Sequence, residues 1–299
     1  KIMLRLCKAF MKKQITLPQG SKMKMLSKMA LVAIISLTGV SAMDCTAIYG
    51  EGKEQIKLAT GSPGELGLLE ELAKAFNAKY DSSLCWIKAG SGESLKLLKE
   101  KQIDIAMVHA PKAEKEAIKE GWAANRTLIG SNEFYILGPK DDPAGIKNSK
   151  NAKEAYSKIA QNQALFYTRA DNSGTHKKEM SIWKSANIEP NGKWYVKNQD
   201  FMLATLKKAD ATKGYFMSDS STYKLAKNEL KNLEILYSND KVLINTYVAM
   251  TTENPSKLAL LFVKFLSEKE GQDIITNYGK EKYKESLYEN AAYAKQHFE

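Results

Sequence analysis

The fold is decided by residues 56–108, which read IKLATGSPGELGLLEELAKAFNAKYDSSLCWIKAGSGESLKLLKEKQIDIAMV. Three short apolar runs in it, IKLAT, LCWIK and IDIAMV, have the length and composition of buried strands. Amphipathic stretches at 65–80 and 94–101 separate these runs and predict helices. Because crossover helices join parallel neighbours, this order predicts an open, mainly parallel α/β sheet.

Polar loops follow the predicted strands. They are TGSPG at 60–64, GSGES at 90–94 and HAP at 109–111. Ligands of open parallel sheets bind outside the carboxyl ends of the strands. We therefore look for the functional site in these loops.

A second α/β unit starts further along the chain. Strands are predicted at 164–168 and 213–218, each followed by a helix. Apolar extended segments at 133–138 and 242–250 flank this unit. A unit inserted into the first one explains this order, with the flanking segments as paired crossover strands of a hinge and the cleft between the lobes.

The lobe boundaries follow from that arrangement. We expect residues 43–137 and 244–299 to form lobe I and residues 138–243 to form the inserted lobe II. The final residues, 280–299, mix Lys, Glu and Tyr at helical spacing and predict a solvated helix on the outer face.

Residues 1–42 have the pattern of a secretory signal. A basic stretch ends at Lys28, and the apolar run MALVAIISLTGV leads to small residues up to Ala42. This run of 12 residues is shorter than the roughly 20 that span a bilayer as a helix. We expect export to the periplasm, cleavage after Ala42, and an upstream extension in residues 1–22.

Positive charge is concentrated in the same segment. The chain has 45 Lys and Arg against 34 Asp and Glu, a net charge of +11. Eight of the basic residues and no acidic residue lie in residues 1–42, and without them the balance falls to +3. Such a balance offers no broad surface for phosphate backbones, so no nucleic-acid partner is expected.

The sequence does not decide whether two of its cysteines form a disulfide. Of three cysteines, Cys7 lies in the expected signal. Cys45 and Cys85 would then share an oxidising compartment, where a disulfide is allowed but not required. The alternative for Cys45 is a lipid anchor, although Asp44 is a poor match to the small residue that precedes a lipid-modified cysteine.

Three loops offer backbone N–H groups and hydroxyls at helix starts. Besides TGSPG and GSGES, DNSGT at 171–175 precedes a predicted helix. Each loop alone is explained more simply as a helix cap, because Ser, Thr, Asp and Asn are preferred there. Three of them facing one cleft favour an anion site.

An arginine stands beside the third loop. Residues 43–299 contain two arginines, Arg126 and Arg169, and Arg169 directly follows a predicted strand. A guanidinium presents fixed, forked donors to an oxyanion and stays charged. The alternative is an ion pair with Asp171, which the position alone favours equally.

Catalytic chemistry is sparse. The three histidines, His109, His176 and His297, lack metal-ligand spacing, and no G-x-S-x-G motif accompanies them. His109 and His176 are expected to support the groups that hold the ligand. We predict no catalytic residue, no metal and no cofactor.

Five segments, at 58–69, 108–114, 133–146, 167–179 and 192–195, resemble in order those of periplasmic tungstate-binding proteins, the solute receptors of tungstate ABC importers. YTRADNSGTHKKE at 167–179 is similar to their SRGDxSGTHKKE, and VHAPKAE at 108–114 to their VHAPxxE. EFYILGPKDDPAGI at 133–146 is similar to their hinge and DPAGI segment. GKWY at 192–195 matches GxWY, and residues 58–69 stand where the family has TTTSTxDSGLL.

The resemblance implies a two-lobed periplasmic-binding-protein fold of type II that closes on a tetrahedral oxyanion and delivers it to an inner-membrane ABC permease. Arg169 would supply the charge, and His109, Asp171 and His176 would lie behind the residues that touch the ligand. The neutral donors carried over by position are Thr60, Gly61, Ser62, Ser91, Ser173 and Thr175.

Departures from the family pattern concern the ligand. TTTS has become ATGS at 59–62, which removes two hydroxyls, and the basic residue of a TDRGT-like stretch is absent from SDSST at 218–222. Loss of one buried donor costs about 1–3 kcal/mol, enough to change which anion binds best. Tungstate, molybdate, sulfate and phosphate all remain candidates.

Other functions also remain open. Tryptophans, including Trp86 and Trp194, would suit stacking on an organic ligand, although core packing explains them more simply. A sensor or receptor without a transporter, or a transfer enzyme using the same anion site, are the alternatives to a monomeric transport receptor.

Overall fold

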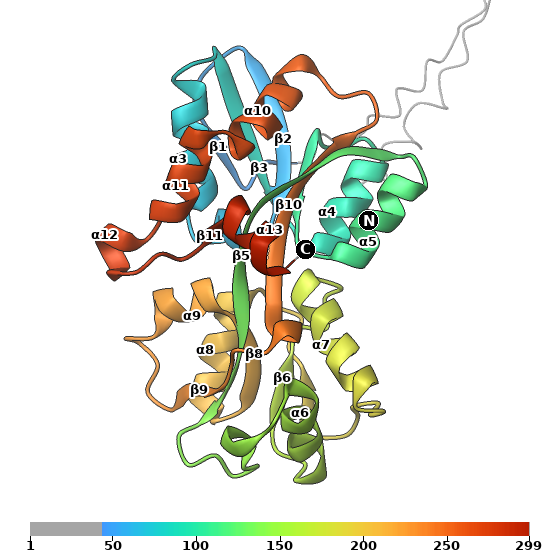
Figure 1. The fold of residues 1–299 in the computed structure, drawn as a ribbon, viewed down its shortest axis with the longest axis vertical. Coiled ribbons are helices and arrows are strands. Elements are labelled where there is room, and N and C mark those ends of the chain that lie inside the picture. The colour runs from blue at the N-terminus through green and yellow to red at the C-terminus, as the bar shows by residue number, and fades with distance from the viewer. Residues whose placement is uncertain (1–43, 299) are drawn as a thin grey trace, which may run out of the picture. The chain divides into compact units, whose positions relative to one another are not determined.

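The stretch at 56–108 forms parallel strands joined by helices, as predicted. The computed structural model describes residues 44–298, and the expected signal in residues 1–42 lies outside them. Strand β2 (Glu54–Thr60) pairs in parallel with β3 (Ser82–Lys88) and with β4 (Ile105–Val108) (Figure 1). Their carboxyl ends therefore meet at one edge of the sheet.

The first crossover consists of two helices rather than the single helix expected at 65–80, and it starts and ends three residues earlier. It consists of α2 (Ser62–Glu65) and α3 (Leu68–Asn77), which are separated at Gly67. Gly67 has φ +92°, a left-handed conformation that glycine adopts readily, and it breaks the continuous helix. The predicted apolar face is confirmed, since α3 buries Leu68, Leu69, Leu72, Ala73 and Phe76.

A disulfide ties the start of the described chain to the same sheet. β1 (Ala47–Tyr49) pairs antiparallel with β3, and Cys45 is bonded to Cys85 with a Cα–Cα distance of 5.3 Å. The pairing that the sequence left open is therefore present. A cysteine bonded in this way has no free sulfur for a lipid anchor.

Two long strands connect the lobes. β5 (Ala123–Pro139) pairs antiparallel with β10 (Ile244–Thr252), from Glu133 opposite Ile244 to Ala123 opposite Thr252. Beyond Glu133, β5 leaves β10 and pairs with β8 (Tyr215–Asp219). The prediction that residues 133–138 form the hinge pair with 242–250 is therefore wrong. The residues of β5 that pair with β10 come earlier in the strand, at 123–133.

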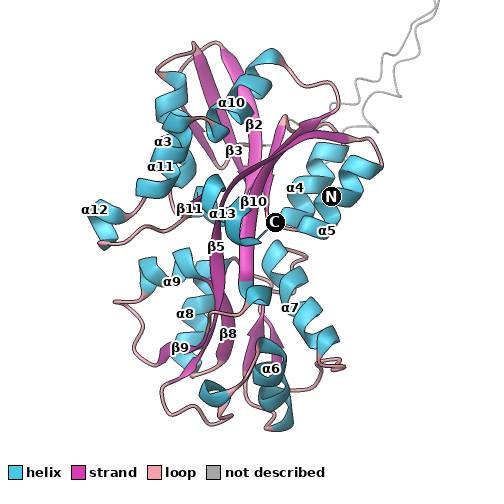
Figure 2. Ribbon diagram, viewed as in Figure 1, coloured by secondary structure: helices cyan, strands magenta, loops and turns pink. Residues whose placement is uncertain are grey.

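Lobe II is a second, smaller parallel arrangement. β6 (Phe166–Thr168) pairs in parallel with β7 (Tyr195–Lys197) and with β8, while β9 (Leu233–Tyr237) pairs antiparallel with β5. Helices lie beside these strands, as Figure 2 shows by colour. They are α6 (Ala152–Gln161), α7 (Gly174–Ser185), α8 (Met202–Thr212) and α9 (Ser220–Ala226), with 3₁₀ turns η1 (Ile146–Asn148) and η2 (Lys241–Leu243).

Three apolar clusters hold the described residues together. One packs around Trp183 in lobe II, and two lie on opposite faces of the lobe I sheet. Phe134, Ile136 and Leu137 of β5 already belong to the lobe II cluster. The boundaries at 137/138 and 243/244 remain a proposal, close to where the strands change sheets.

The C-terminal segment forms the predicted exposed helix only in part, as α13 (Ala291–Phe298), and is not one continuous helix. After α12 (Lys280–Tyr283), Leu287 and Tyr288 are buried, and β11 (Glu289–Asn290) pairs with Ser131 and Gly130 of β5. The apolar residues at 287–288 are inserted between the lobes, which a helical periodicity over 280–299 obscures.

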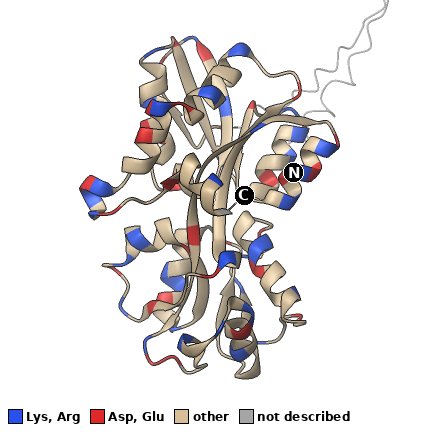
Figure 3. Cartoon of the chain, in the orientation of Figure 1, with Lys and Arg blue, Asp and Glu red and all other residues tan. Residues whose placement is uncertain are grey.

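The remaining helices surround lobe I. They are α4 (Ser91–Lys99), α5 (Pro111–Lys119), α10 (Lys257–Ser267), α11 (Lys269–Asn277) and α13 (Ala291–Phe298). Within residues 44–298, no helix has the length and apolar content needed to cross a membrane. Acidic and basic residues are interspersed over the elements of both lobes in Figure 3.

Candidate functional site

Loops from both lobes meet at the carboxyl ends of the strands. A Cβ built on Gly90 would lie 3.1 Å from Cβ of Ser173, and one on Gly92 would lie 2.5 Å from the main-chain oxygen of Asn172. Gly90 and Gly92 belong to lobe I, whereas Asn172 and Ser173 belong to lobe II. The glycines thus allow backbone-to-backbone approach of the two lobes, which are closed on each other here.

Six of the seven residues expected to touch the ligand are buried at this junction. Their exposed fractions are at most 7%, and Gly61 is partly exposed. The six are Thr60, Ser62, Ser91, Arg169, Ser173 and Thr175. Their assignment as ligand-binding residues stays a prediction, but the structure brings their loops together.

Two hydroxyls at the junction have no hydrogen-bond partner among the described residues. They belong to Thr60, at the end of β2, and Thr175, in the first turn of α7. Burying a hydroxyl without a partner costs about 1–3 kcal/mol. Two such groups, one from each lobe, are suited to donate to the oxygens of an anion.

Valine at these two positions tests that interpretation. Valine has the shape of threonine without the hydroxyl, so Thr60→Val and Thr175→Val should each leave the free energy of unfolding of the ligand-free protein within about 1 kcal/mol of wild type. Each should weaken anion binding by about 1–3 kcal/mol. Thermal unfolding and calorimetry measure the two effects, and unchanged binding in both variants would remove these hydroxyls from the site.

Arg169 forms the ion pair that the sequence offered as its alternative role. Its Nε and Nη2 donate to Oδ2 of Asp171 at 3.0 and 2.5 Å, and Oδ1 of Asp171 accepts from the N–H of Ser173. A guanidinium has five N–H donors, so three remain beyond this pair. Asp171 thus holds the arginine in place while leaving part of its fork for a ligand.

The three serines differ in what their hydroxyls already do. Oγ of Ser173 accepts from the N–H of His176 as the N-cap of α7, and Oγ of Ser91 accepts from the N–H of His109. Both hydroxyls can still donate a hydrogen to an anion. Ser62 instead points its hydroxyl at Oδ2 of Asp219, 3.4 Å away.

Asp219 is a buried carboxylate at the junction that the sequence analysis did not select. Its Oδ1 accepts from the N–H of Thr222 and its Oδ2 from the hydroxyl of Thr222, at 2.9 and 2.7 Å. Burial raises the pKa of Asp219 above its ordinary value, against these hydrogen bonds. The SDSST segment pointed to hydroxyls there, and nothing in it distinguished the carboxylate from a simple helix cap.

Burial favours the neutral form of both histidines near the junction. Burial lowers the pKa of His109 to about 4, and burial also lowers the pKa of His176. Nδ1 of His176 accepts from the N–H of Asn172 at 3.2 Å. Neither imidazole therefore adds positive charge to that of Arg169.

A second cation approaches from lobe I. Nζ of Lys88 lies 4.1 Å from the ring centroid of Phe201, and Cζ of Arg169 lies 5.3 Å from the same centroid. Lys88 also pairs with Glu65 at 2.7 Å. The position of Lys88 at the end of β3, ahead of GSGES, was the signal available in the sequence.

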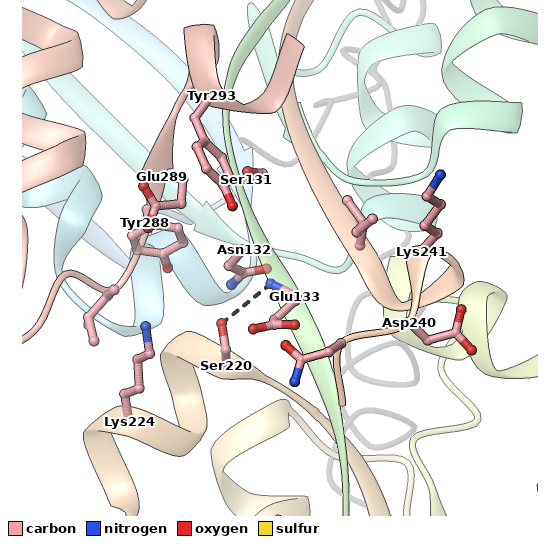
Figure 4. A pocket seen from close by; sticks show the side chains of 13 residues that line it. Ser131, Asn132, Glu133, Ser220, Lys224, Asp240, Lys241, Tyr288, Glu289 and Tyr293 are labelled. Carbon is pink, nitrogen blue, oxygen red and sulfur yellow. Dashed lines mark hydrogen bonds between the residues drawn. The ribbon is translucent and has the colours of Figure 1, made fainter. Parts of the chain in front are cut away.

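A separate cavity of about 330 Å³ lies at the hinge (Figure 4). Asn132 and Glu133 of β5, Ser220 of α9 and Tyr288 of the C-terminal segment line it. None of the residues expected to touch the ligand contributes to its walls. No group of three or more His, Cys, Asp and Glu within 44–298 is arranged to hold a metal ion.

Two lobes on paired hinge strands, closing on a small junction of hydroxyls and one arginine, define a two-lobed solute-binding protein. Residues 47–270 match the family described as PBP superfamily domain, and the chain belongs to that superfamily. The predicted type II two-lobed α/β fold is confirmed.

Three known proteins are similar to this chain over most of its length. The chain is 33% identical over 271 residues to the tungstate-binding protein TupA of Peptoclostridium acidaminophilum, covering 86% of this chain and 94% of the relative. It is 36% identical over 241 residues to a putative ABC transporter anion-binding protein of Haloferax volcanii, covering 77% and 70%. The crystal structure of the tungstate ABC transporter from Geobacter sulfurreducens is 34% identical, with a TM-score of 0.67 and coverage of 76% and 100%. The predicted resemblance to tungstate-binding proteins is confirmed, and by their descriptions these relatives bind or transport anions.

Proposed function

We propose that this protein captures a tetrahedral oxyanion, foremost tungstate, between its lobes and delivers it to an ABC permease. One observation carries the proposal: the unpartnered hydroxyls of Thr60 and Thr175 are buried on opposite lobes at the junction that also holds Arg169. An oxyanion has oxygens to accept from both. Its charge matches the one guanidinium that the described part of the junction contains.

The donor set suits an anion without a proton to donate. Hydroxyls, backbone N–H groups and guanidinium N–H groups all donate, so they suit an anion whose oxygens only accept. The negative charge of Asp219 opposes the binding of a highly charged anion. The hydroxyls of Ser62 and Thr222 are directed at this carboxylate. Arg169 and, at longer range, Lys88 offset that carboxylate.

The proposed location is the periplasm, reached by a cleaved signal. The bond between Cys45 and Cys85 supports an oxidising compartment, where disulfides form and persist. We further propose that the protein is monomeric, has no nucleic-acid partner and is a receptor rather than an enzyme, since its relatives are described as binding or transport proteins.

Calorimetry of residues 43–299 against tungstate, molybdate, sulfate and phosphate tests the proposal. We expect tungstate or molybdate to bind with the lowest Kd, and saturating ligand to stimulate ATP hydrolysis by the cognate permease in liposomes. Binding without any effect on the permease would point to a sensor. Failure of all four anions to bind would reject the oxyanion assignment.

Gly61 tests how the altered first loop affects selectivity. The family pattern TTTS has threonine at this position, and a Cβ on Gly61 would meet only the main-chain oxygen of Ala89, at 3.4 Å. Gly61→Thr should therefore fit, add a hydroxyl to the site and raise tungstate affinity roughly 10-fold relative to sulfate. Loss of all anion binding in a folded Gly61→Thr protein would show that the backbone at Gly61 itself contacts the ligand.

A further inference from the structure

Two buried asparagines face each other across the hinge strands. Asn132 of β5 is the register partner of Asn245 of β10, and their exposed fractions are 7% and 3%. Nδ2 of Asn245 donates to Oδ1 of Asn132 at 2.7 Å. A side-chain hydrogen bond at this place joins the strands where the chain passes between the lobes.

The carboxylate of Asp219 fixes the direction of this hydrogen bond. Oδ1 of Asp219 accepts from the N–H of Thr222, so the amide group of Asn132 that faces it, at 3.3 Å, is the Nδ2 donor. The same Nδ2 donates to Oγ of Ser221 at 2.7 Å. Oδ1 of Asn132 must then face Asn245.

The orientation of the Asn245 amide determines which ring nitrogen of His109 carries the hydrogen. Because Asn245 uses Nδ2 to reach Asn132, its Oδ1 faces Nδ1 of His109, 2.8 Å away. A carbonyl oxygen only accepts, so Nδ1 carries the hydrogen and Nε2 of the neutral ring has none. The tautomer of His109 is thus set by a chain of three side chains that begins at Asp219.

His109 lies where the lobes touch. Its N–H donates to Oγ of Ser91 in lobe I, and its ring lies within 2.6 Å of a Cβ built on Gly174, at the start of α7 in lobe II. The charged groups around the ring are Arg169, Lys178 and Asp171. An imidazolium would face the positive end of α7 as well as Arg169 and Lys178, so only a neutral ring allows this approach.

We propose that Asn245 and Asn132 are positioning residues, which hold the imidazole of His109 in its Nδ1–H tautomer against Gly174 and so set the contact on which the lobes close. The proposal deepens the proposed function and rests on it only for its effect on anion affinity. The state of the ring is independent of any ligand.

Nitrogen NMR of the ring provides the direct test. The chain has three histidines, so ¹⁵N-histidine labelling gives three sets of ring signals, which His176→Gln and His297→Gln variants assign. Protonated and bare ring nitrogens resonate far apart. In the ligand-free protein at pH 7 we expect His109 to carry its proton on Nδ1.

Substitution of Asn245 should then change the ring. Asn245→Leu removes the acceptor, so we expect His109 to take up Nε2–H or a mixture of tautomers, and the Kd for tungstate to rise roughly 10-fold. Asn245→Asp keeps an acceptor opposite Nδ1, so the proton should stay there even if Asn245→Leu fails to fold. Asn77→Leu, which removes an asparagine bonded to Ser82 and Tyr49 within lobe I, is the matched control and should leave the His109 signals and the Kd unchanged.

Either of two results would overturn the proposal. One is a proton on Nε2 of His109 in the wild-type protein. The other is a folded Asn245→Leu protein whose His109 signals equal those of the wild type. If the wild-type protein binds none of the four anions but His109 has the Nδ1–H form, the proposed function fails and the hydrogen-bond assignment stands.

Discussion

Replacing Arg169 with alanine is expected to raise the Kd for tungstate at least roughly 30-fold, because truncating one member of a buried charge pair costs about 2–5 kcal/mol. Arg169 is 4% exposed and is the permanent charge among otherwise neutral donors. Its loss also leaves the carboxylate of Asp171 without its partner beside the anion. Calorimetry with tungstate measures the change.

Arg126 offers the matched control. It is the other arginine of residues 43–299, and it pairs with the buried Glu114 at 2.9 Å in lobe I. Arg126→Ala should lower the melting temperature by leaving that carboxylate unpaired, while the Kd for tungstate stays at the wild-type value. If Arg169→Ala folds and binds as tightly as wild type, the anion is bound elsewhere.

Adding a methyl group at Gly174 should prevent the lobes from closing. A Cβ there would lie 2.5 Å from Cε1 of His109 and 2.6 Å from its main-chain oxygen, and a main-chain atom cannot turn aside. Overpacking of this kind costs about 1–3 kcal/mol, which corresponds to a Kd raised roughly 5- to 150-fold. Alanine is favourable within a helix, so the ligand-free protein should be as stable as wild type.

Solution scattering separates this effect from a loss of stability. Tungstate should reduce the radius of gyration of the wild-type protein and fail to do so with Gly174→Ala. Gly145→Ala is the control, because Gly145 has φ +68° and a Cβ there would have nothing within 4 Å. It should lower the melting temperature and leave closure intact. If tungstate reduces the radius of gyration of Gly174→Ala as much as that of the wild-type protein, the contact between Gly174 and His109 does not limit closure.

Sequence patterns identified the parts of the fold that depend on local periodicity. The alternation of β2, α3, β3, α4 and β4 could be read from apolar runs and amphipathic faces because each element buries its own side chains. The strands β7 and β9, of three and five residues, were not predicted, although β6 and β8 of the same lengths were. The register of β5 against β10 was also not predictable, because β5 belongs to both sheets and leaves β10 for β8 after Glu133.

The sequence predicted the parts of the site that lie in helix-capping loops. It did not predict the side-chain contacts between the hinge strands. Thr60, Arg169 and Thr175 stand at strand ends and helix starts, which single them out. Asn132 and Asn245 are 113 residues apart and lie inside apolar strands, so their partnership depends on strand register alone. The same holds for the insertion of Tyr288 between the lobes.

The unpartnered hydroxyls of Thr60 and Thr175 also bear on how well the protein resists proteolysis. An anion that binds only the folded chain stabilises it by about 2.7 kcal/mol when present at a hundred times its Kd. Proteases that attack transiently unfolded chains would then cut the loaded protein roughly a hundred times more slowly. Under the proposed function, the supply of the anion would therefore lengthen the lifetime of its own receptor.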